Sequence, residues 1–313
     1  MKKNLSHIGE FGLIERICKK VNVYEKMWTG IGDDAAILKE GKEFSLLAMD
    51  LMVEGVDFSF RSATPEEIGR KALAINLSDI AAMGSDPQAV LIGLVMPRTT
   101  TLETVDRFYK GFTKLAKKFR VSIVGGDLSH GRLWTVSVAI FGRARVKPIL
   151  RSGAKPGDLI CVTGTFGGSI LKKHLHFEPR IKEGKFLAQM GAHSMIDVSD
   201  GLVQDLQHVL RASKVGAQLW LDRIPISRDA KQLAKGNREK ALQRALTDGE
   251  DFELLCTISP AAWKQIEQGW TKRFRVPIGS IGVIKSGKPE ISFYEKSREV
   301  HMKQFPKGYQ HFK

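Results

Sequence analysis

Short apolar segments alternate along the chain with longer amphipathic ones. Residues 44–49 (FSLLAM), 121–124 (VSIV) and 134–141 (WTVSVAIF) are apolar or β-branched and are bounded by polar residues or glycine, which predicts strands. Residues 64–67 (TPEE) combine an N-cap threonine, a proline in the first turn and a capping-box glutamate. A helix is therefore predicted from this point to about Gly84.

The same alternation continues through the rest of the chain. A second helix is predicted over 102–119, and the turn-rich segment 151–158 (RSGAKPGD) leads into LICVTG, which is typical of a buried strand. A further strand is predicted at 195–196, then a helix over about 200–213 and a strand at 252–258. This order of elements predicts a mixed α/β protein.

Length and composition fit two medium-sized domains. The chain has 313 residues, of which 42% are hydrophobic and 27% charged, as is ordinary for globular proteins. The turn-rich stretch after residue 145 is the natural place for a boundary. We expect an N-terminal domain over 1–147 and a C-terminal domain over 148–313.

Charge and cysteine content narrow the partners and the compartment. The formal net charge of +15 indicates either a basic solvated surface or an anionic partner, but dense Lys/Arg runs, RNA-binding aromatic motifs and zinc-finger spacings are missing, so nucleic acid is not favoured. Charges interrupt each apolar run of the N-terminal segment, as in neither a secretory signal nor a membrane span. Cys18, Cys161 and Cys256 have no metal-ligand spacing. We expect a cytoplasmic protein without a membrane partner.

The acidic residues gather in short segments at predicted strand ends, loops and helix starts, where ligand sites are commonly built. These segments are 30–34 (GIGDD), 49–50 (MD), 76–79 (NLSD), 125–127 (GGD), 197–200 (DVSD) and 248–251 (DGED).

Asp79 is the most informative of these acids. Together with Ile68, Ala72 and Ile75 it follows helical spacing and falls on the apolar face of the predicted helix. A carboxylate buried there must take up a proton, pair with a base or bind a cation, so a structural salt bridge and a metal site both remain open. Several aspartates without clustered His or Cys favour magnesium over zinc.

Ordinary structural roles compete for the other segments. Asp33 and Asp34 fit an exposed glycine-rich turn, and 125–127 fits either a phosphate cradle or a plain turn. Residues 197–200 fit either phosphate binding at a helix N-terminus or capping by Ser199 or Asp197. The run 248–251 fits an exposed hairpin turn. The chain has neither GxxxxGK[ST] nor the protein-kinase motifs, so any ATP site must use other loops.

Taken together, GIGDDAAIL, KALAINLSDIAAMG, VGGD, SGAKPGD, MIDVSDGL and DGEDFELL resemble the thiamine-monophosphate kinase family in order and spacing over nearly the whole chain. The resemblance implies a two-domain α/β fold like that of aminoimidazole-ribonucleotide synthetase, in which the N-terminal sheet dimerises into a barrel and a C-terminal α/β domain follows. It also implies a homodimer, ATP in the cleft between the domains, and Mg²⁺-assisted phosphorylation of thiamine monophosphate to thiamine diphosphate.

The resemblance assigns roles residue by residue. It implies magnesium ligands at Asp34, Asp50, Asp79, Asp127, Asp197 and Asp200, and all of these except Asp197 are expected to be catalytic. It implies ATP contacts at Tyr109, Gly126, Asp127, Arg151 and Ser199, and acceptor contacts at Asp57, Glu250 and Tyr309. Arg151 also fits a surface arginine beside a turn, and Tyr309 fits a C-terminal anchor.

Three features depart from the family pattern. Ala48 and Met49 stand where hydroxyl residues usually precede Asp50, the segment 164–174 is short, and Asp57 replaces a typical histidine near the acceptor. An added magnesium, a nearby base such as Arg61, or an orientation of Asp57 toward the thiazolium would compensate. Another ATP-using enzyme of the same superfamily and a noncatalytic nucleotide-binding homologue remain alternatives.

Overall fold

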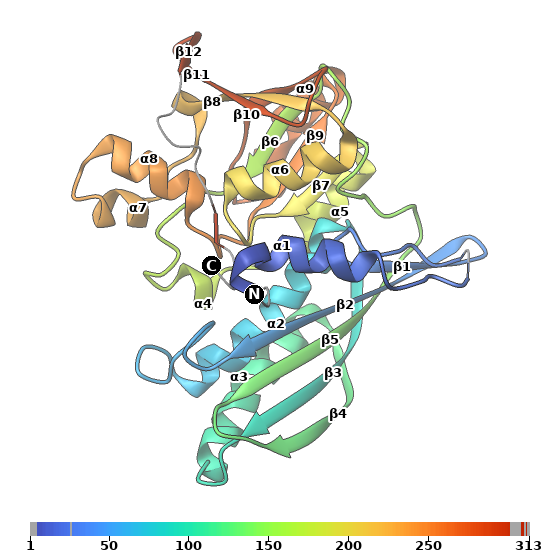
Figure 1. Cartoon of the computed structure of the whole chain (residues 1–313), viewed down its shortest axis with the longest axis vertical. Coiled ribbons are helices and arrows are strands. Elements are labelled where there is room, and N and C mark those ends of the chain that lie inside the picture. The colour runs from blue at the N-terminus through green and yellow to red at the C-terminus, as the bar shows by residue number, and fades with distance from the viewer. Residues whose placement is uncertain (1–4, 26, 301–307, 310, 312–313) are drawn as a thin grey trace.

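The computed structural model describes residues 5–25, 27–300, 308–309 and 311, which form two β-sheets with helices packed around them. Figure 1 shows the five-stranded sheet in the lower half of the molecule and the seven-stranded sheet in the upper half. The predicted mixed α/β architecture is confirmed. No helix in this described part combines the length and apolar composition that crossing a bilayer requires.

The first sheet has the order β1-β2-β5-β3-β4, and all its pairs are antiparallel except β3 with β4. The strands predicted at 44–49, 121–124 and 134–141 are confirmed, although β2 and β4 run several residues further than predicted. The strands are β1 (Ala36–Glu40), β2 (Glu43–Val53), β3 (Asp86–Met96), β4 (Ser122–His130) and β5 (Thr135–Ala144).

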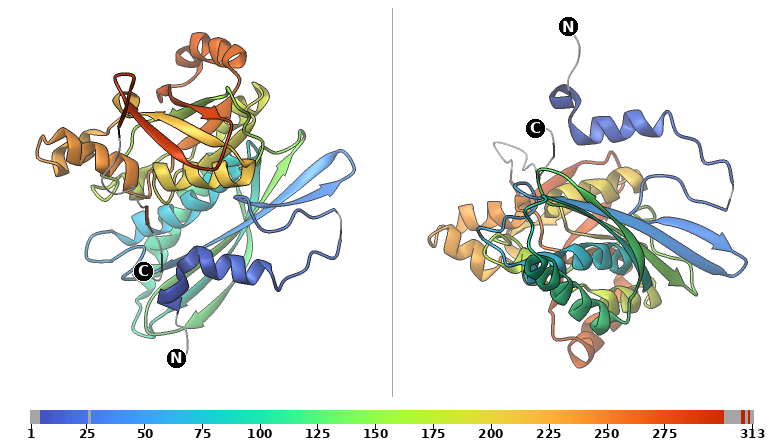
Figure 2. Two further views of the ribbon diagram at one scale, coloured as in Figure 1. Left: turned by 45° about the horizontal axis from the view of Figure 1, so that its top comes forward. Right: turned by 90° about the horizontal axis from the view of Figure 1, so that it is seen from below.

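Two helices, α2 (Pro65–Ala82) and α3 (Leu102–Phe119), cover one face of this sheet, as Figure 2 shows from below. Both were predicted, and the capping box of Thr64 and Glu67 is present at the start of α2. The helices approach closely at Gly69, where a Cβ atom would lie 2.0 Å from the carbonyl oxygen of Phe108. A side chain at this position would force the two helices apart.

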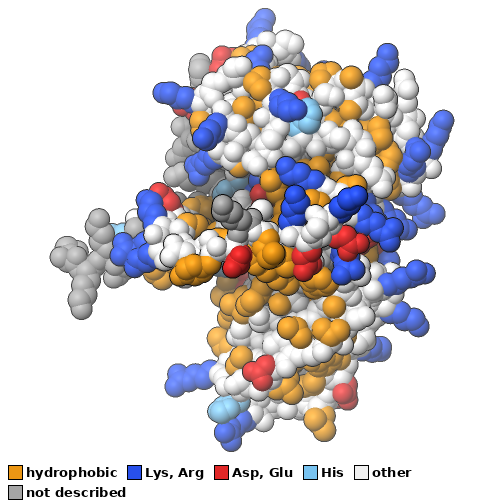
Figure 3. All heavy atoms as spheres, turned by 90° about the vertical axis from the view of Figure 1, so that its right-hand side faces the viewer, with side chains coloured by type: hydrophobic (Ala, Val, Ile, Leu, Met, Phe, Trp, Pro, Cys, Tyr) orange, Lys and Arg blue, Asp and Glu red, His pale blue; other side chains and the backbone are white. Residues whose placement is uncertain are grey.

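The other face of the first sheet, here called the outer face, exposes apolar side chains from β2 and β3. Figure 3 shows hydrophobic side chains gathered over the lower half of the molecule, where this sheet lies. A contiguous apolar surface of this kind marks an interaction site in a soluble protein. The outer face includes Leu47, Met49, Leu51 and Leu91, with exposed fractions between 43% and 65%.

The second sheet has the order β12-β11-β8-β10-β6-β9-β7. The strands predicted at LICVTG, 195–196 and 252–258 correspond to β6, β7 and β9. The strands are β6 (Leu159–Thr163), β7 (Ser194–Asp197), β8 (Gly216–Trp220), β9 (Leu254–Ile258), β10 (Ile278–Lys285), β11 (Ile291–Glu295) and β12 (Arg298–Val300).

The remaining helices surround the second sheet and its boundary with the first. The helix predicted over 200–213 is α6, which begins two residues later than predicted. These elements are α1 (Leu5–Cys18), α4 (Lys173–His176), α5 (Ile181–Gln189), α6 (Leu202–Ser213), the 3-10 turn η1 (Leu221–Arg223), α7 (Arg228–Leu233), α8 (Arg238–Thr247) and α9 (Pro260–Arg273).

Helix α2 lies between the two halves and contacts β2 and β5 on one side and α5 and β7 on the other. Its Ser78 Oγ donates to Asp197 Oδ2 at 2.6 Å, which joins the C-terminal part of α2 to the end of β7. The chain passes from one sheet to the other between Ala144 and Leu159. A domain boundary at 147/148 stays a prediction.

Candidate functional site

A cavity of about 780 Å³ lies where α2 meets the end of β7. Its walls come from β2, α2, the loops that precede β1 and α6, the 248–250 loop and the C-terminal segment. Ten of the predicted site residues line it, eight of which are Asp34, Asp50, Asp79, Arg151, Asp197, Ser199, Asp200 and Glu250. The other two are Asp57 and Tyr309.

Four carboxylates from separate elements converge inside this cavity. Carboxylate oxygens of Asp34, Asp79 and Asp197 lie within 4.8 Å of one another. Asp50 lines the same cavity and, in addition to burial, raises the pKa of Asp79 through its charge. We call these four residues the carboxylate cluster. The Asp34 side chain is completely buried, so the interpretation of 33–34 as an exposed turn is wrong.

Burial and mutual repulsion make these carboxyls weak acids. Burial raises the pKa of Asp50 to about 6 and that of Asp197 to about 7. The pKa of Asp79 lies well above its usual range, first because the group is buried and then because Asp50, Asp197 and Asp34 are close. At neutral pH the cluster must therefore keep protons or bind cations.

Arg151 is the cationic residue that pairs with this cluster. Its backbone N–H donates to Asp33 Oδ1 and its guanidinium to Asp34 Oδ1, both at 2.6 Å. The interpretation of Arg151 as a surface arginine is therefore wrong. Asp79 makes no ion pair of its own among the residues described, so the salt-bridge interpretation of Asp79 is not supported.

The second oxygen of Asp34 tests whether the cluster suits a metal ion. Oδ2 is buried and has no hydrogen-bond partner in the described parts of the chain. Buried acceptors are rarely left unpaired, and an orphan carboxylate oxygen beside three more carboxylates is the donor set that a hard divalent cation takes. The residues present fit such an ion.

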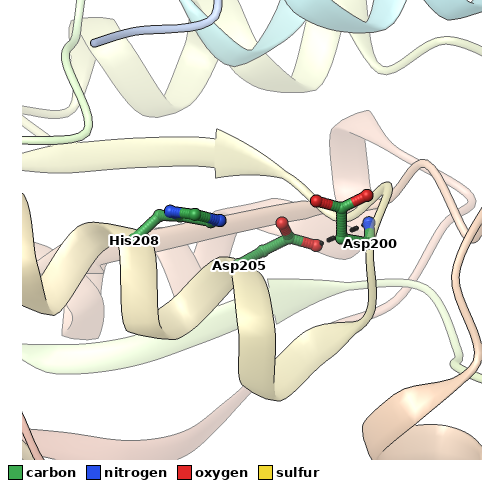
Figure 4. Close-up of side chains that lie close together, drawn as sticks. All are labelled: Asp200, Asp205 and His208. Carbon is green, nitrogen blue, oxygen red and sulfur yellow. Dashed lines mark hydrogen bonds between the residues drawn. The ribbon is translucent and has the colours of Figure 1, made fainter. Parts of the chain in front are cut away.

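Asp200 lines the cavity just before the start of α6, and Figure 4 shows it beside Asp205 of that helix. Asp205 Oδ2 accepts the backbone N–H groups of Asp200 at 3.0 Å and Gly201 at 3.1 Å. The helix is therefore capped from within, and the predicted capping by Ser199 or Asp197 is wrong. One turn further, burial lowers the pKa of His208 to about 4, so that this imidazole is neutral at pH 7.

The acidic run 248–251 is a partly buried loop held by hydrogen bonds and not an exposed hairpin turn. Asp251 is fully buried, accepts the N–H of Gly167 at 2.8 Å and pairs with Lys173 at 3.2 Å. Asp248 accepts the N–H of Gly168 at 2.9 Å. These bonds fix the loop and leave Glu250, which has a left-handed φ of 60°, at the cavity wall.

Asp57 and Tyr309 occupy the rim of the cavity. Asp57 Oδ2 accepts the N–H of Val53 at 2.7 Å, which closes the turn after β2. The Tyr309 backbone is anchored because its N–H donates to the Asp200 carbonyl at 2.9 Å, while its side chain stays half exposed. The anchoring interpretation of Tyr309 is therefore correct for the backbone, and the ring remains available to a ligand.

Tyr109, Gly126 and Asp127 lie away from the carboxylate cluster. They line a separate pocket of about 440 Å³ on β4, so the GGD segment is part of a strand and its interpretation as a turn is wrong. Register connects Leu51, beside Asp50, through β5 and β3 to Asp127. Three strand spacings of about 4.8 Å separate the two backbones by roughly 14 Å. One chain therefore does not bring Asp127 to the cluster.

Sequence reasoning missed Glu10, Asp33 and Lys71, which also line the cavity. A signal for Lys71 was present, because Lys71, Ile75 and Asp79 follow i, i+4, i+8 on one helical face. The sequence signal for Asp205 was weaker, because it consisted only of an acidic residue one turn into a predicted amphipathic helix.

Similarity to known proteins covers almost the entire chain. Residues 32–144 match the family described as AIR synthase related protein, N-terminal domain. A thiamine-monophosphate kinase of Rhodopirellula baltica is 39% identical over 295 residues, 90% of each chain, and one of Bacillus subtilis is 33% identical over 98% of this chain and all of its own.

Similarity in structure leads to the same family. The solved structure of AaThiL complexed with AMPPCP and TMP superposes with a TM-score of 0.85 at 30% identity and covers 99% of both chains. The predicted resemblance and the predicted synthetase-like α/β fold are thus confirmed, whereas dimerisation of the N-terminal sheet into a barrel stays a prediction. The chain belongs to the thiamine-monophosphate kinase family.

Proposed function

We propose that this chain transfers the γ-phosphate of ATP directly to the phosphate of thiamine monophosphate, giving ADP and thiamine diphosphate. The observation that carries the proposal is the carboxylate cluster in a cavity large enough for phosphorylated ligands. The full-length relatives named thiamine-monophosphate kinase support this substrate pair over that of another branch of the superfamily. The convergent aspartates argue against a noncatalytic homologue.

Asp34, Asp50, Asp79, Asp197 and Asp200 would hold magnesium ions in this site. Bound there, the ions would neutralise the negative charge of both phosphorylated ligands and of the transferring group. The side chains of the protein orient ATP and screen its negative charge. Arg151 offers its guanidinium to ATP phosphate oxygens, and Ser199 offers a hydroxyl near the start of α6. Glu250 and Tyr309 face the cationic acceptor ring, which suits a carboxylate and an aromatic side chain.

The chain acts as a homodimer in this proposal, joined through the outer face. An exposed apolar surface across β2 and β3 is expected to be covered in solution. Pairing two such faces in a barrel would bring Asp127 of the partner subunit to the carboxylate cluster. Tyr109 on α3 and Gly126 on β4 line the same pocket as Asp127 and would contact ATP there. Each site would then need both subunits.

Product analysis tests the proposed reaction. Purified protein is incubated with ATP, thiamine monophosphate and Mg²⁺, and thiamine diphosphate is measured as its fluorescent thiochrome after chromatography. We expect thiamine diphosphate and ADP to form in a one-to-one ratio. ADP that forms at the same rate without thiamine monophosphate would contradict the proposal.

The stabilising effect of magnesium should depend on pH. Because burial raises the pKa of Asp50 to about 6 and that of Asp197 to about 7, their contribution to folding is favourable at low pH and is lost as pH rises through 6–7. Magnesium requires the deprotonated form. We expect Mg²⁺ to raise the melting temperature by several degrees at pH 8 and hardly at all at pH 5.

Thermal unfolding with and without Mg²⁺ at both pH values measures this difference in melting temperature. NaCl at matched ionic strength is the control for charge screening. An equal Mg²⁺ effect at pH 5 and pH 8 would mean that these carboxyls do not bind the ion.

Asp57→His should preserve or lower the KM for thiamine monophosphate. The Asp57 carboxylate adds negative charge near an anionic acceptor, and a neutral imidazole nitrogen can still accept the N–H of Val53. Of the expected compensating groups, Arg61 does not line the cavity, whereas Lys71 donates to the Asp57 carbonyl at 2.7 Å. Initial rates at saturating ATP measure the change. Loss of turnover in Asp57→His would show that Asp57 has a positive role.

A further inference from the structure

A buried lysine stands in the wall of the otherwise acidic cavity. Lys71 lies on α2, its side chain is 1% exposed, and its ammonium donates to Glu250 Oε1 and, at 2.7 Å, to the Asp57 carbonyl. Glu250 belongs to the loop between α8 and β9, so this ion pair joins the two halves of the molecule inside the cavity. Removing an ammonium from water is costly unless a carboxylate compensates it.

The ion pair is asymmetric. The Glu250 side chain is 36% exposed, whereas Lys71 has almost no contact with solvent. Among the described hydrogen bonds, only Oε1 of the Glu250 carboxylate is engaged. The buried Lys71 ammonium depends on Glu250 for charge compensation. The Glu250 carboxylate is partly exposed and can be solvated by water, so it depends on Lys71 only for its orientation.

The surrounding structure restricts Glu250 to this position. Its backbone N–H donates to the Ser199 carbonyl at 2.6 Å, and its φ of 60° is one that side-chain-bearing residues seldom adopt. The neighbouring acids Asp248 and Asp251 are bound to the 167–168 backbone. With the backbone fixed, the orientation of the carboxylate depends on the partner of Oε1.

We propose that Lys71 is a positioning residue for the acceptor: it holds one oxygen of Glu250 and thereby aims the other at the cationic ring of the acceptor. This inference rests on the proposed function, in which Glu250 faces that ring. Without Lys71 the carboxylate rotates freely at the rim, and ordering it again weakens binding. The reacting phosphates lie at the carboxylate cluster, so the rate at saturation depends little on Lys71.

Lys71→Met, which keeps the length of the side chain and removes the charge, tests the inference. We expect the KM for thiamine monophosphate to rise about tenfold or more, with kcat within about threefold and the KM for ATP unchanged. The control is Lys185→Met, which breaks another ion pair between the two halves, with Asp86, that is half exposed and outside the cavity. Its acceptor KM should stay within about twofold of the unaltered protein.

Two further measurements separate positioning from direct contact and from simple stability. Lys71→Met/Glu250→Gln should bind the acceptor no more weakly than Glu250→Gln alone, because both changes remove the same interaction. Glu250→Gln, which leaves a buried ammonium unpaired, should lower the melting temperature by about 4 °C or more. Lys71→Met should lower it by less than about 2 °C.

Calorimetric titration with thiamine monophosphate and Mg²⁺, without ATP, measures acceptor binding independently of turnover. If the unaltered protein binds but produces no thiamine diphosphate, the proposed function fails while weakened binding in Lys71→Met still supports the inference. Unchanged binding in Lys71→Met, or losses that add in the double variant, would overturn the positioning role, even if turnover is normal. Absence of binding by the unaltered protein would overturn both.

Discussion

Asp79→Asn should lower phosphoryl transfer by about 100-fold or more and leave a folded protein that is at least as stable without magnesium. Asp79 lies among Asp34, Asp50 and Asp197, and its pKa is raised first by burial and then by these carboxylates. A neutral amide of the same shape removes part of that repulsion. The same change removes a negative charge that magnesium needs.

Two measurements belong together here: the initial rate at saturating ATP and Mg²⁺, and the melting temperature without divalent cation. Asp106→Asn is the matched control, since Asp106 is exposed on α3 and lies outside the cavity. Its rate and melting temperature should be unchanged. A rate for Asp79→Asn near that of the unaltered protein would refute the role of Asp79, and a collapse in melting temperature would show that the carboxylate is structural.

Mixing two inactive variants should restore activity if each site is built from two subunits. Asp79→Asn disables the cluster of its own subunit, whereas Asp127→Asn disables what that subunit gives to its partner. In a mixed dimer, one site combines the intact cluster with the intact Asp127 and is complete. Random pairing of equal amounts makes half of the dimers mixed, each with one complete site of two, so about one quarter of the full activity should return.

Co-refolding the two variants, or producing them together with different tags, allows subunits to exchange, and light scattering checks the dimer. Each variant refolded alone is the control and should remain inactive. Dimers without recovered activity would place Asp127 at the site of its own chain or outside any site. A monomer at micromolar concentration would contradict the homodimer itself.

The parts of the fold that depend on local interactions could be predicted from sequence. The start of helix α2 could be predicted because the side chains of Thr64 and Glu67, three residues apart, hydrogen-bond to each other's backbone N–H. The start of α6 could not be predicted in the same way, because Asp205 caps it from inside the helix. Strand β4 was predicted too short, since two consecutive glycines favour a turn. In the structure Gly126 packs against β3, where a Cβ atom would lie 1.9 Å from the Ile92 carbonyl oxygen.

Site residues could be predicted from sequence where the pattern of a single helix or strand was enough to place them. Helical spacing alone placed Asp79 on an inward face, and the structure puts it in the carboxylate cluster. Lys71 has the same spacing, but its partner Glu250 lies 179 residues away, so the sequence gives no reason to expect a buried ion pair. The separation of Asp127 from Asp50 depends on strand order, which only long-range pairing sets.

The fate of the γ-phosphate tests the central claim most directly. Enzyme in excess is mixed with ATP labelled with ³²P at the γ position, thiamine monophosphate and Mg²⁺, and the products are separated after a single turnover. Direct transfer at the carboxylate cluster predicts that the label appears in thiamine diphosphate, that chelation with EDTA abolishes its appearance, and that added Mg²⁺ restores it. Label that appears only in inorganic phosphate, or transfer that continues at full rate after chelation, would contradict the account.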